Sequence, residues 1–180
     1  FFEDMKQGNR ENLREKAGNF LELFTVLSAG FVLLASEVYR YVYVSRDFWG
    51  STMLIPIFVS SYYTNFLCTF PVNFEYYHKK TKVVSIITIV SSLINVGLNY
   101  LLILRIGMAG AAVATLISHS LQLTLHYLYV RFALGGKEYP FPLKMWVGYA
   151  AVFAAVAVAS VAADGLWLAR WGLGAAVGLL

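Results

Sequence analysis

Long uncharged hydrophobic runs alternate with short polar segments along the whole chain. Because an α-helix rises about 1.5 Å per residue, about 20 apolar residues cross the hydrocarbon of a bilayer. The pattern therefore predicts five membrane-spanning helices and the start of a sixth, at 18–38, within 48–74, at 83–104, within 106–130, at 145–163 and from about 166 onward. The last run is cut off at Leu180 and the chain does not begin with Met, so we expect a fragment of a longer protein.

The third predicted span carries its polar residues on one helix face. They recur at spacings of 3, 4, 3 and 4, at Ser85, Thr88, Ser92, Asn95 and Asn99. An Asn in mid-membrane is costly unless it is hydrogen-bonded, so this stripe is expected to face other helices or an aqueous cavity. Bonding between helices would by itself explain any single Asn.

The fourth predicted span repeats this arrangement with two histidines. Its polar residues are spaced 4, 3 and 4, at Thr115, His119, Gln122 and His126. The histidines could relay protons, recognise an anionic head group, or only bond to neighbouring helices. We expect no metal site, because no carboxylate or second ligand pair accompanies them. Gly110, Ala114 and Ser118 form a ridge of small residues that allows close helix packing.

Composition supports a polytopic membrane protein. Of 180 residues, 59% are hydrophobic and 13% are charged, and the mean hydropathy is +0.64. A soluble domain would bury too little of this apolar surface. The single cysteine, Cys68, excludes a disulfide within the chain. The net charge of +4 does not indicate nucleic-acid binding, because the basic residues lie between the spans.

The distribution of Lys and Arg predicts the orientation. Successive segments outside the spans carry 4, 2, 3, 1, 3 and 1 of these residues. This alternation follows the positive-inside rule and places the first, third and fifth segments in the cytoplasm. Glu75 is then expected at the cytoplasmic interface. Within the second span, Pro56 and Pro71 are expected to kink the helix.

These boundaries predict four regions. Residues 1–17 would form a cytoplasmic linker helix near the membrane surface, with apolar positions too sparse for a buried helix. Residues 18–132 would form a four-span bundle, 133–144 a cytoplasmic loop, and 145–180 an additional, truncated helix pair outside that bundle.

No enzyme motif is found in the sequence. It has no Gly-rich phosphate loop after a strand, no nucleophile elbow and no paired carboxylates within one span. A transporter therefore competes with a membrane-embedded transferase that acts on a lipid-linked substrate. Short loops favour the transporter, and neither a cofactor nor enzymatic activity is expected.

Three segments carry a resemblance to a known family. They are the turn FEYYHKKTK (74–82), the helix segment INVGLNY (94–100) and the turn GMAGAAVAT (107–115). In these segments the chain resembles the C-terminal half of bacterial polysaccharide flippases of the Wzx type. That family belongs to the MOP group, which also includes lipid II flippases and multidrug exporters of the MATE kind. The resemblance covers roughly 19–129.

The resemblance implies an all-α polytopic fold, the C-terminal lobe of a transporter with 12 or 14 spans. The spans here would be the ninth to twelfth, followed by a thirteenth and part of a fourteenth. The implied activity is the flipping of oligosaccharide repeat units linked to undecaprenyl pyrophosphate across the bacterial inner membrane by alternating access. Such transport serves O-antigen, capsule or exopolysaccharide assembly. The implied partners are this lipid-linked oligosaccharide, membrane lipids, a polysaccharide polymerase and a chain-length partner.

Eight residues are candidates for substrate contact in such a flippase. Lys79, Lys80 and Lys82 could attract the diphosphate at the cytoplasmic mouth, or could only orient the helix and meet anionic lipid. The residues that could bond sugar hydroxyls are Asn95, Asn99, His119, Gln122 and His126. The alternative transporter is a cation-coupled exporter of small molecules, which would need a carboxylate inside a span.

Overall fold

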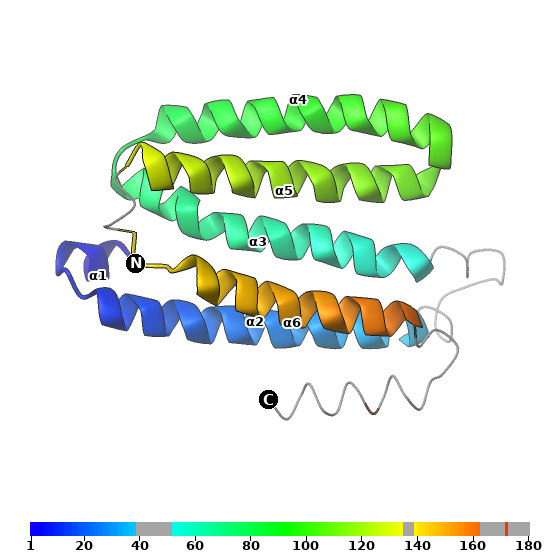
Figure 1. Cartoon of the computed structure of the whole chain (residues 1–180), viewed down its shortest axis with the longest axis horizontal. Helices are drawn as coiled ribbons and strands as arrows, with labels where there is room; N and C mark the ends of the chain where they lie inside the picture. The colour runs from blue at the N-terminus through cyan, green and yellow to red at the C-terminus, as the bar shows by residue number, and fades with distance from the viewer. Residues whose placement is uncertain (39–51, 135–138, 163–171, 173–180) are drawn as a thin grey trace.

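The computed structural model describes residues 1–38, 52–134, 139–162 and 172, and the described part is helical with no strand (Figure 1). The helices are α1 (Phe2–Lys6), α2 (Arg10–Val38), α3 (Ile55–Tyr77), α4 (Thr81–Ile106), α5 (Met108–Phe132) and α6 (Leu143–Ala162). Five of them, α2 to α6, are long and apolar enough to cross a membrane, as the sequence predicts. The predicted sixth span, from about 166 to 180, lies outside the described residues apart from Gly172.

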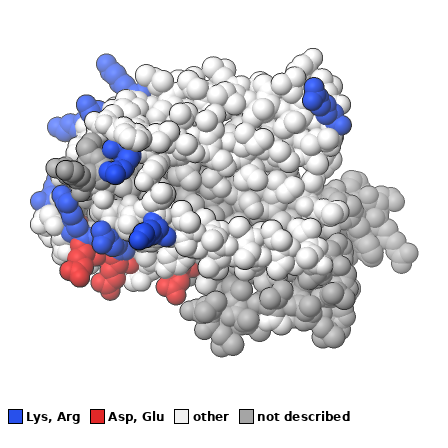
Figure 2. Space-filling view, in the orientation of Figure 1, with Lys and Arg blue, Asp and Glu red and all other residues white. Residues whose placement is uncertain are grey.

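The long helices lie side by side, and their charged residues gather at one end of the bundle (Figures 1 and 2). That end carries the N-terminus, α1, the α3–α4 turn and the end of α5, while the α4–α5 turn with Arg105 lies at the other end. Between the two ends this view shows mostly uncharged residues. The charge asymmetry predicted from the sequence is therefore present in space, and the cytoplasmic assignment stays a prediction.

The first membrane helix begins earlier than predicted, so residues 1–17 do not form a separate linker helix. The five-residue α1 ends before Gly8, which has a φ of 68°, and α2 then runs unbroken from Arg10. Leu13 and Ala17 are buried, contrary to the expectation that this segment is too sparsely apolar. Widely spaced apolar residues are sufficient to bury one face of this segment, because they pack in a cluster with aromatic side chains such as Phe1 and Phe141.

An apolar core joins α2, α3 and α6. Leu21 and Val32 of α2 pack in it with Tyr63 of α3 and Phe153 of α6. The rings of Tyr63 and Phe153 stack with their centroids 4.4 Å apart. The helix expected in an additional pair outside the bundle is thus one wall of the main core. The Ala- and Val-rich sequence of α6 allows close packing. Its nearly uniform apolar pattern does not indicate which helices it packs against.

Helices α4 and α5 form a tight hairpin around two glycines. Gly107 has a φ of 62°, which favours glycine, and Gly110 sits against the backbone of Leu102 so closely that a Cβ there would clash. α5 packs against both α3 and α4, whereas α4 is the outermost helix of the described part (Figure 1). The small-residue ridge therefore serves the α4–α5 contact.

Helix α3 ends in a Schellman motif that has a lysine where glycine is usual. The Lys79 N–H donates to the Tyr76 carbonyl and the Lys80 N–H to the Glu75 carbonyl, at 2.9 Å each. Lys79 has a φ of 57°. Pro56 lies in the first turn of α3, where its missing N–H has no helical partner to lose, so it starts the helix and does not kink it. Pro71 lies inside the helix, which continues past it.

Candidate functional site

A polar hollow of about 250 Å³ lies between α4 and α5. We call it the α4–α5 hollow. Its lining, Val96 apart, consists of side chains that can form hydrogen bonds and carry no fixed charge, namely Ser91, Ser92, Asn95, Thr115, Ser118, His119 and Gln122. Three of the eight predicted contact residues, Asn95, His119 and Gln122, therefore lie together, although they come from two helices. Ser91 was missed because it falls beside the polar stripe and not within it.

Asn95 is held in the hollow by polar neighbours on both helices. Its Nδ2 donates to Ser118 Oγ of α5 at 3.2 Å, and its Oδ1 accepts from Asn99 Nδ2 at 2.9 Å. Asn99 also donates to the Asn95 carbonyl. An amide side chain has two donor hydrogens and two acceptor lone pairs, so Asn95 keeps one of each for a ligand. Asn99 positions Asn95 and does not line the hollow.

His119 and Gln122 are placed differently by their partners. His119 Nδ1 lies 2.9 Å from the Ser61 carbonyl of α3, so this nitrogen carries the hydrogen and donates it. Its Nε2 has no hydrogen bond in the described structure. Gln122 Nε2 is 3.5 Å from Thr88 Oγ1, the limit of a hydrogen bond, so its amide is the least satisfied in the hollow.

The polar stripe of α4 lies at the flank of that helix and is not turned fully inward. The packed positions of α4 include Val84 and Ser91, while Ser85, Thr88 and Ser92 are exposed. The hydroxyls of Ser85 and Ser92 donate to carbonyls of their own helix. Exposed hydroxyl groups along an otherwise apolar helix suit an aqueous cavity or a further protein surface better than lipid.

His126 does not join the hollow, because it pairs with Glu75. The His126 Nδ1 and Glu75 Oε1 atoms are 2.8 Å apart, and both side chains are 0% exposed. One expectation is therefore wrong, because a carboxylate does accompany one of the histidines. The position of Glu75 at the cytoplasmic interface stays a prediction, although its side chain is buried in the bundle. Glu75 and His126 are 51 positions apart, and no local spacing rule connects them. Among the described residues, no group of three His, Cys, Asp or Glu is arranged to hold a metal ion.

The three lysines lie at the charged end of the bundle, away from the hollow. Lys79, Lys80 and Lys82 are exposed. Lys82 and Ser92 belong to one helix and are about 15 Å apart along its axis. The structure therefore separates the lysines from the three hollow residues, and Lys79 and Lys80 also supply the Schellman hydrogen bonds that end α3.

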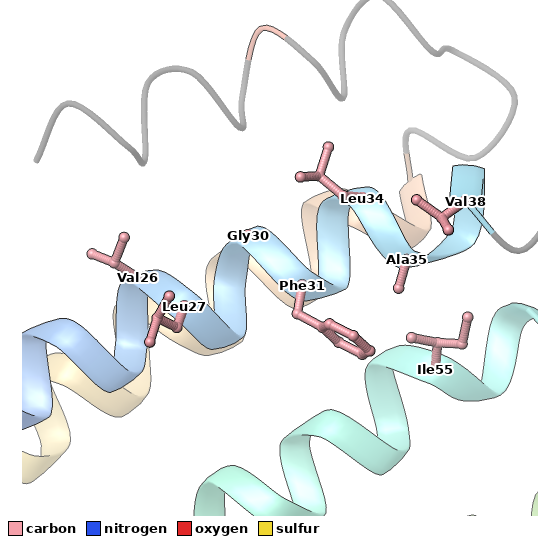
Figure 3. A pocket seen from close by; sticks show the side chains of 8 residues that line it. All are labelled: Val26, Leu27, Gly30, Phe31, Leu34, Ala35, Val38 and Ile55. Atoms are coloured by element: carbon pink, nitrogen blue, oxygen red, sulfur yellow. The ribbon is translucent and has the colours of Figure 1, made fainter.

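A larger cavity of about 750 Å³ lies along α2 and is lined by apolar residues (Figure 3). Phe31 and Ala35 point from α2 toward the start of α3, where Ile55 lies. Because the described residues of its lining include no polar side chain, this cavity is not part of the polar site.

Polar contacts at the charged end connect the N-terminal segment to the bundle. Lys16 Nζ donates to Asp4 Oδ1 at 3.0 Å, and Asn12 Nδ2 donates to the same oxygen. The hydrogen bond from Lys16 lowers the pKa of the Asp4 carboxyl below its usual value. Arg14 Nε donates to the Pro140 carbonyl at 3.1 Å. Burial raises the pKa of Tyr139, beside that proline, well above its usual value.

Comparisons of the chain with protein-family models, curated proteins and solved structures found no match.

Proposed function

We propose that the protein moves a lipid-linked oligosaccharide across a membrane, with the α4–α5 hollow as a contact site for its sugar hydroxyls. The observation that carries the proposal is the hollow itself, an uncharged, hydrogen-bonding site within helices able to cross a membrane. Sugars offer many hydroxyl donors and acceptors and no charge, which is the chemistry that Asn, Gln, Ser and neutral His side chains match.

The size of the hollow limits its role. Ligand pockets usually have volumes of about 300–1,000 Å³, so a hollow of about 250 Å³ would contact part of a cargo and not enclose it. The exposed flank of α4, with Ser85, Thr88 and Ser92, extends the polar surface along the helix. Such a strip suits a cargo that slides past a helix, and it provides one wall of a pathway. The resemblance to Wzx-type flippases assigns the cargo as an oligosaccharide on undecaprenyl pyrophosphate in the bacterial inner membrane.

The second candidate, a cation-coupled exporter of small molecules, gains support from Glu75. This alternative needs a carboxylate inside a span, and Glu75 is buried in α3. It ranks second because Glu75 lies near the end of α3 and away from the hollow.

Deleting the gene tests the cargo. We expect lipid-linked repeat units to accumulate on the inner leaflet and surface polysaccharide to disappear, with both restored by the wild-type gene. Normal polysaccharide with altered drug or ion sensitivity would instead favour the exporter.

Complementation with Gln122→Ala then tests the hollow. Because one hydrogen bond contributes about 1 kcal/mol, we expect surface polysaccharide assembly to fall about fivefold at equal protein level. Ser120→Ala is the matched control on α5, since the exposed Ser120 hydroxyl donates only to the Leu116 carbonyl. Equal activity of the two variants would remove the hollow from the transport path.

Thiol labelling tests whether the hollow is wet in the membrane. In a protein lacking Cys68, we expect Asn95→Cys to react with a membrane-impermeant maleimide and Leu93→Cys to stay unreacted. Leu93 is 68% exposed in the structure, so its protection would show that its face meets lipid. Labelling of Leu93→Cys at the rate of Asn95→Cys would contradict the assignment of these two faces.

The lysines are proposed to attract the diphosphate before it reaches the hollow. Replacing Lys79, Lys80 and Lys82 with Gln should lower polysaccharide assembly without lowering membrane insertion. Unchanged assembly would leave them only a role in topology and anionic-lipid contact.

A further inference from the structure

Four ionisable side chains near the charged end of the bundle have a buried polar atom with no partner in the described structure. These atoms are the Oε2 of Glu75, the Nε2 of His126, the Nε2 of His78 and the hydroxyl of Tyr139. Phe74 contacts the rings of both His78 and Tyr139, so these groups surround one end of α3. Glu75 and His126 form the centre, because they bond to each other at 2.8 Å across the α3–α5 interface.

The contact between Glu75 Oε1 and His126 Nδ1 requires one proton between the two atoms, since two bare acceptors would repel. With that proton alone, the pair is a neutral imidazole beside a carboxylate and has a net charge of −1. With a second proton, the pair is an imidazolium beside a carboxylate, or an imidazole beside a carboxylic acid. In every two-proton arrangement the net charge is zero. The second proton then lies on His126 Nε2 or on Glu75 Oε2, the two atoms of the pair that are buried without a partner in the described structure.

Burial favours the two-proton state. An uncompensated charge inside a low-dielectric interior is far more costly than a neutral pair, and groups so placed neutralise by taking up a proton. In the described structure, Glu75 forms an ion pair only with His126 and none with a Lys or Arg. Lys79, Lys80 and Lys82 are exposed, with their charges in solvent.

Among the described residues, the other titratable groups around the pair do not supply a fixed positive charge. Cys68 on α3 and Tyr139 before α6 both interact electrostatically with Glu75, and both are neutral when protonated. Tyr127 on α5 acts on Tyr139 in the same way. Of the described residues close to the pair, His78 in the turn after α3 can become positive, and its Nε2 has no hydrogen-bond partner in the described structure.

We propose that Glu75 and His126 form a proton-binding site that holds two protons while α3 and α5 pack together, and releases one when water reaches the pair. The site would connect proton occupancy to separation of α3 from α5 at the charged end of the bundle. The proposal does not depend on the cargo, because it concerns a buried pair outside the α4–α5 hollow.

Nitrogen NMR of the wild-type protein in lipid bilayers tests the proton count. With ¹⁵N-labelled histidine, the three histidines His78, His119 and His126 give the only ring signals of this chain. His78→Gln and His119→Gln identify the His126 signal while Glu75 and His126 stay intact. Side-chain ¹³C labelling of glutamate reports the protonation of Glu75 in the same samples. At pH 7 we expect either a hydrogen on His126 Nε2 or a protonated Glu75 carboxyl, and the loss of that proton at higher pH. A bare His126 Nε2 together with an ionised Glu75 carboxyl at pH 7 would overturn the proposal.

Labelling of Cys68 tests the connection to opening. Cys68 is buried in α3 and is the only cysteine of this chain. We would compare maleimide labelling rates of wild type and Glu75→Gln from pH 6 to 9. The thiol reacts only after opening, when water separates it from Glu75, so its own pH dependence is the same in both proteins and cancels in the ratio. The ratio should rise by about tenfold per pH unit where the pair loses its proton, because one proton leaves per opening event. A ratio that stays constant over this range, with either Glu75→Gln or His126→Gln as the reference, would contradict the coupling.

Discussion

The two sides of the bundle pack with different kinds of side chain. Helices α2, α3 and α6 enclose large apolar and aromatic side chains such as Leu21, Tyr63 and Phe153. Helices α4 and α5 meet through Gly110, Ala114 and Ser118, with polar side chains beside this contact. Large side chains in contact leave no room for a ligand, whereas small residues let two helices approach closely and leave space beside their contact. The polar hollow therefore lies on the α4–α5 side.

The two sides also differ in what holds their helices together. The apolar core holds its helices by dispersion contacts that are lost when any large side chain is removed. The α4–α5 side depends on close backbone approach, which is lost when a small side chain is enlarged. Shortening a large side chain should therefore damage the α2–α3–α6 side, and enlarging a small side chain should damage the α4–α5 side.

Phe153→Ala should be the most destabilising change. Phe153 is 3% exposed and stacks on Tyr63 across the α3–α6 contact. Truncating a buried Phe typically costs about 3–5 kcal/mol, because the neighbours cannot close the cavity that is left. The measurement is thermal or denaturant unfolding in detergent. Val152→Ala is the control, since Val152 is exposed on the same helix, and equal losses would show that α6 is not part of the core.

Gly110→Ala should damage the hairpin by adding a single methyl group. The new Cβ would meet the backbone of Leu102, which cannot move aside as a flexible side chain can. Overpacking of this kind costs about 1–3 kcal/mol. Gly97→Ala, on α4 with open space around it, should be neutral or stabilising. Unfolding measurements that rank the two variants in the reverse order would contradict the close α4–α5 contact.

Lys79→Gly should stabilise the protein slightly. Lys79 has a φ of 57°, a conformation that costs a non-glycine residue about 1 kcal/mol. Lys80→Gly is the matched control, because Lys80 has a φ of −93° and gains nothing from glycine. If Lys79→Gly raises the unfolding temperature but lowers polysaccharide assembly, the charge of Lys79 has a role beyond ending α3.

Acidification should weaken the attachment of α1 to α2, with the smallest effect of the set. The Lys16 hydrogen bond lowers the pKa of Asp4, so this carboxyl contributes stability above its unfolded-state pKa. The contribution is lost as the pH falls through the lower, folded-state pKa. Hydrogen exchange of the first turn of α2 should therefore rise below pH 4, and Asp4→Asn should abolish that pH dependence. Unaltered exchange in both proteins would mean that the Asp4–Lys16 bond contributes little.

Local sequence patterns determined the helices of this protein. Long uncharged runs determine which segments can cross a bilayer, because every backbone polar group in lipid must be satisfied within its own helix or barrel. Spacings of three and four placed Asn95 with its stripe on α4 and His119 with Gln122 on α5, and the structure brings these three residues to one hollow. The Lys and Arg count of each loop is also a local property of the sequence, so charge alternation predicted which loops lie at which end of the bundle.

Only the tertiary structure decided which faces meet. Periodicity placed His126 on the same face as Gln122, yet His126 turns to Glu75 of α3 and leaves the hollow. The Ala- and Val-rich composition of α6 predicted a separate helix pair, yet Phe153 of α6 packs in the main core. These contacts join residues far apart in the chain, and each depends on side-chain shape and on the packing of several helices at once. A helical pattern defines a face of one helix, but it contains no information about the partner of that face.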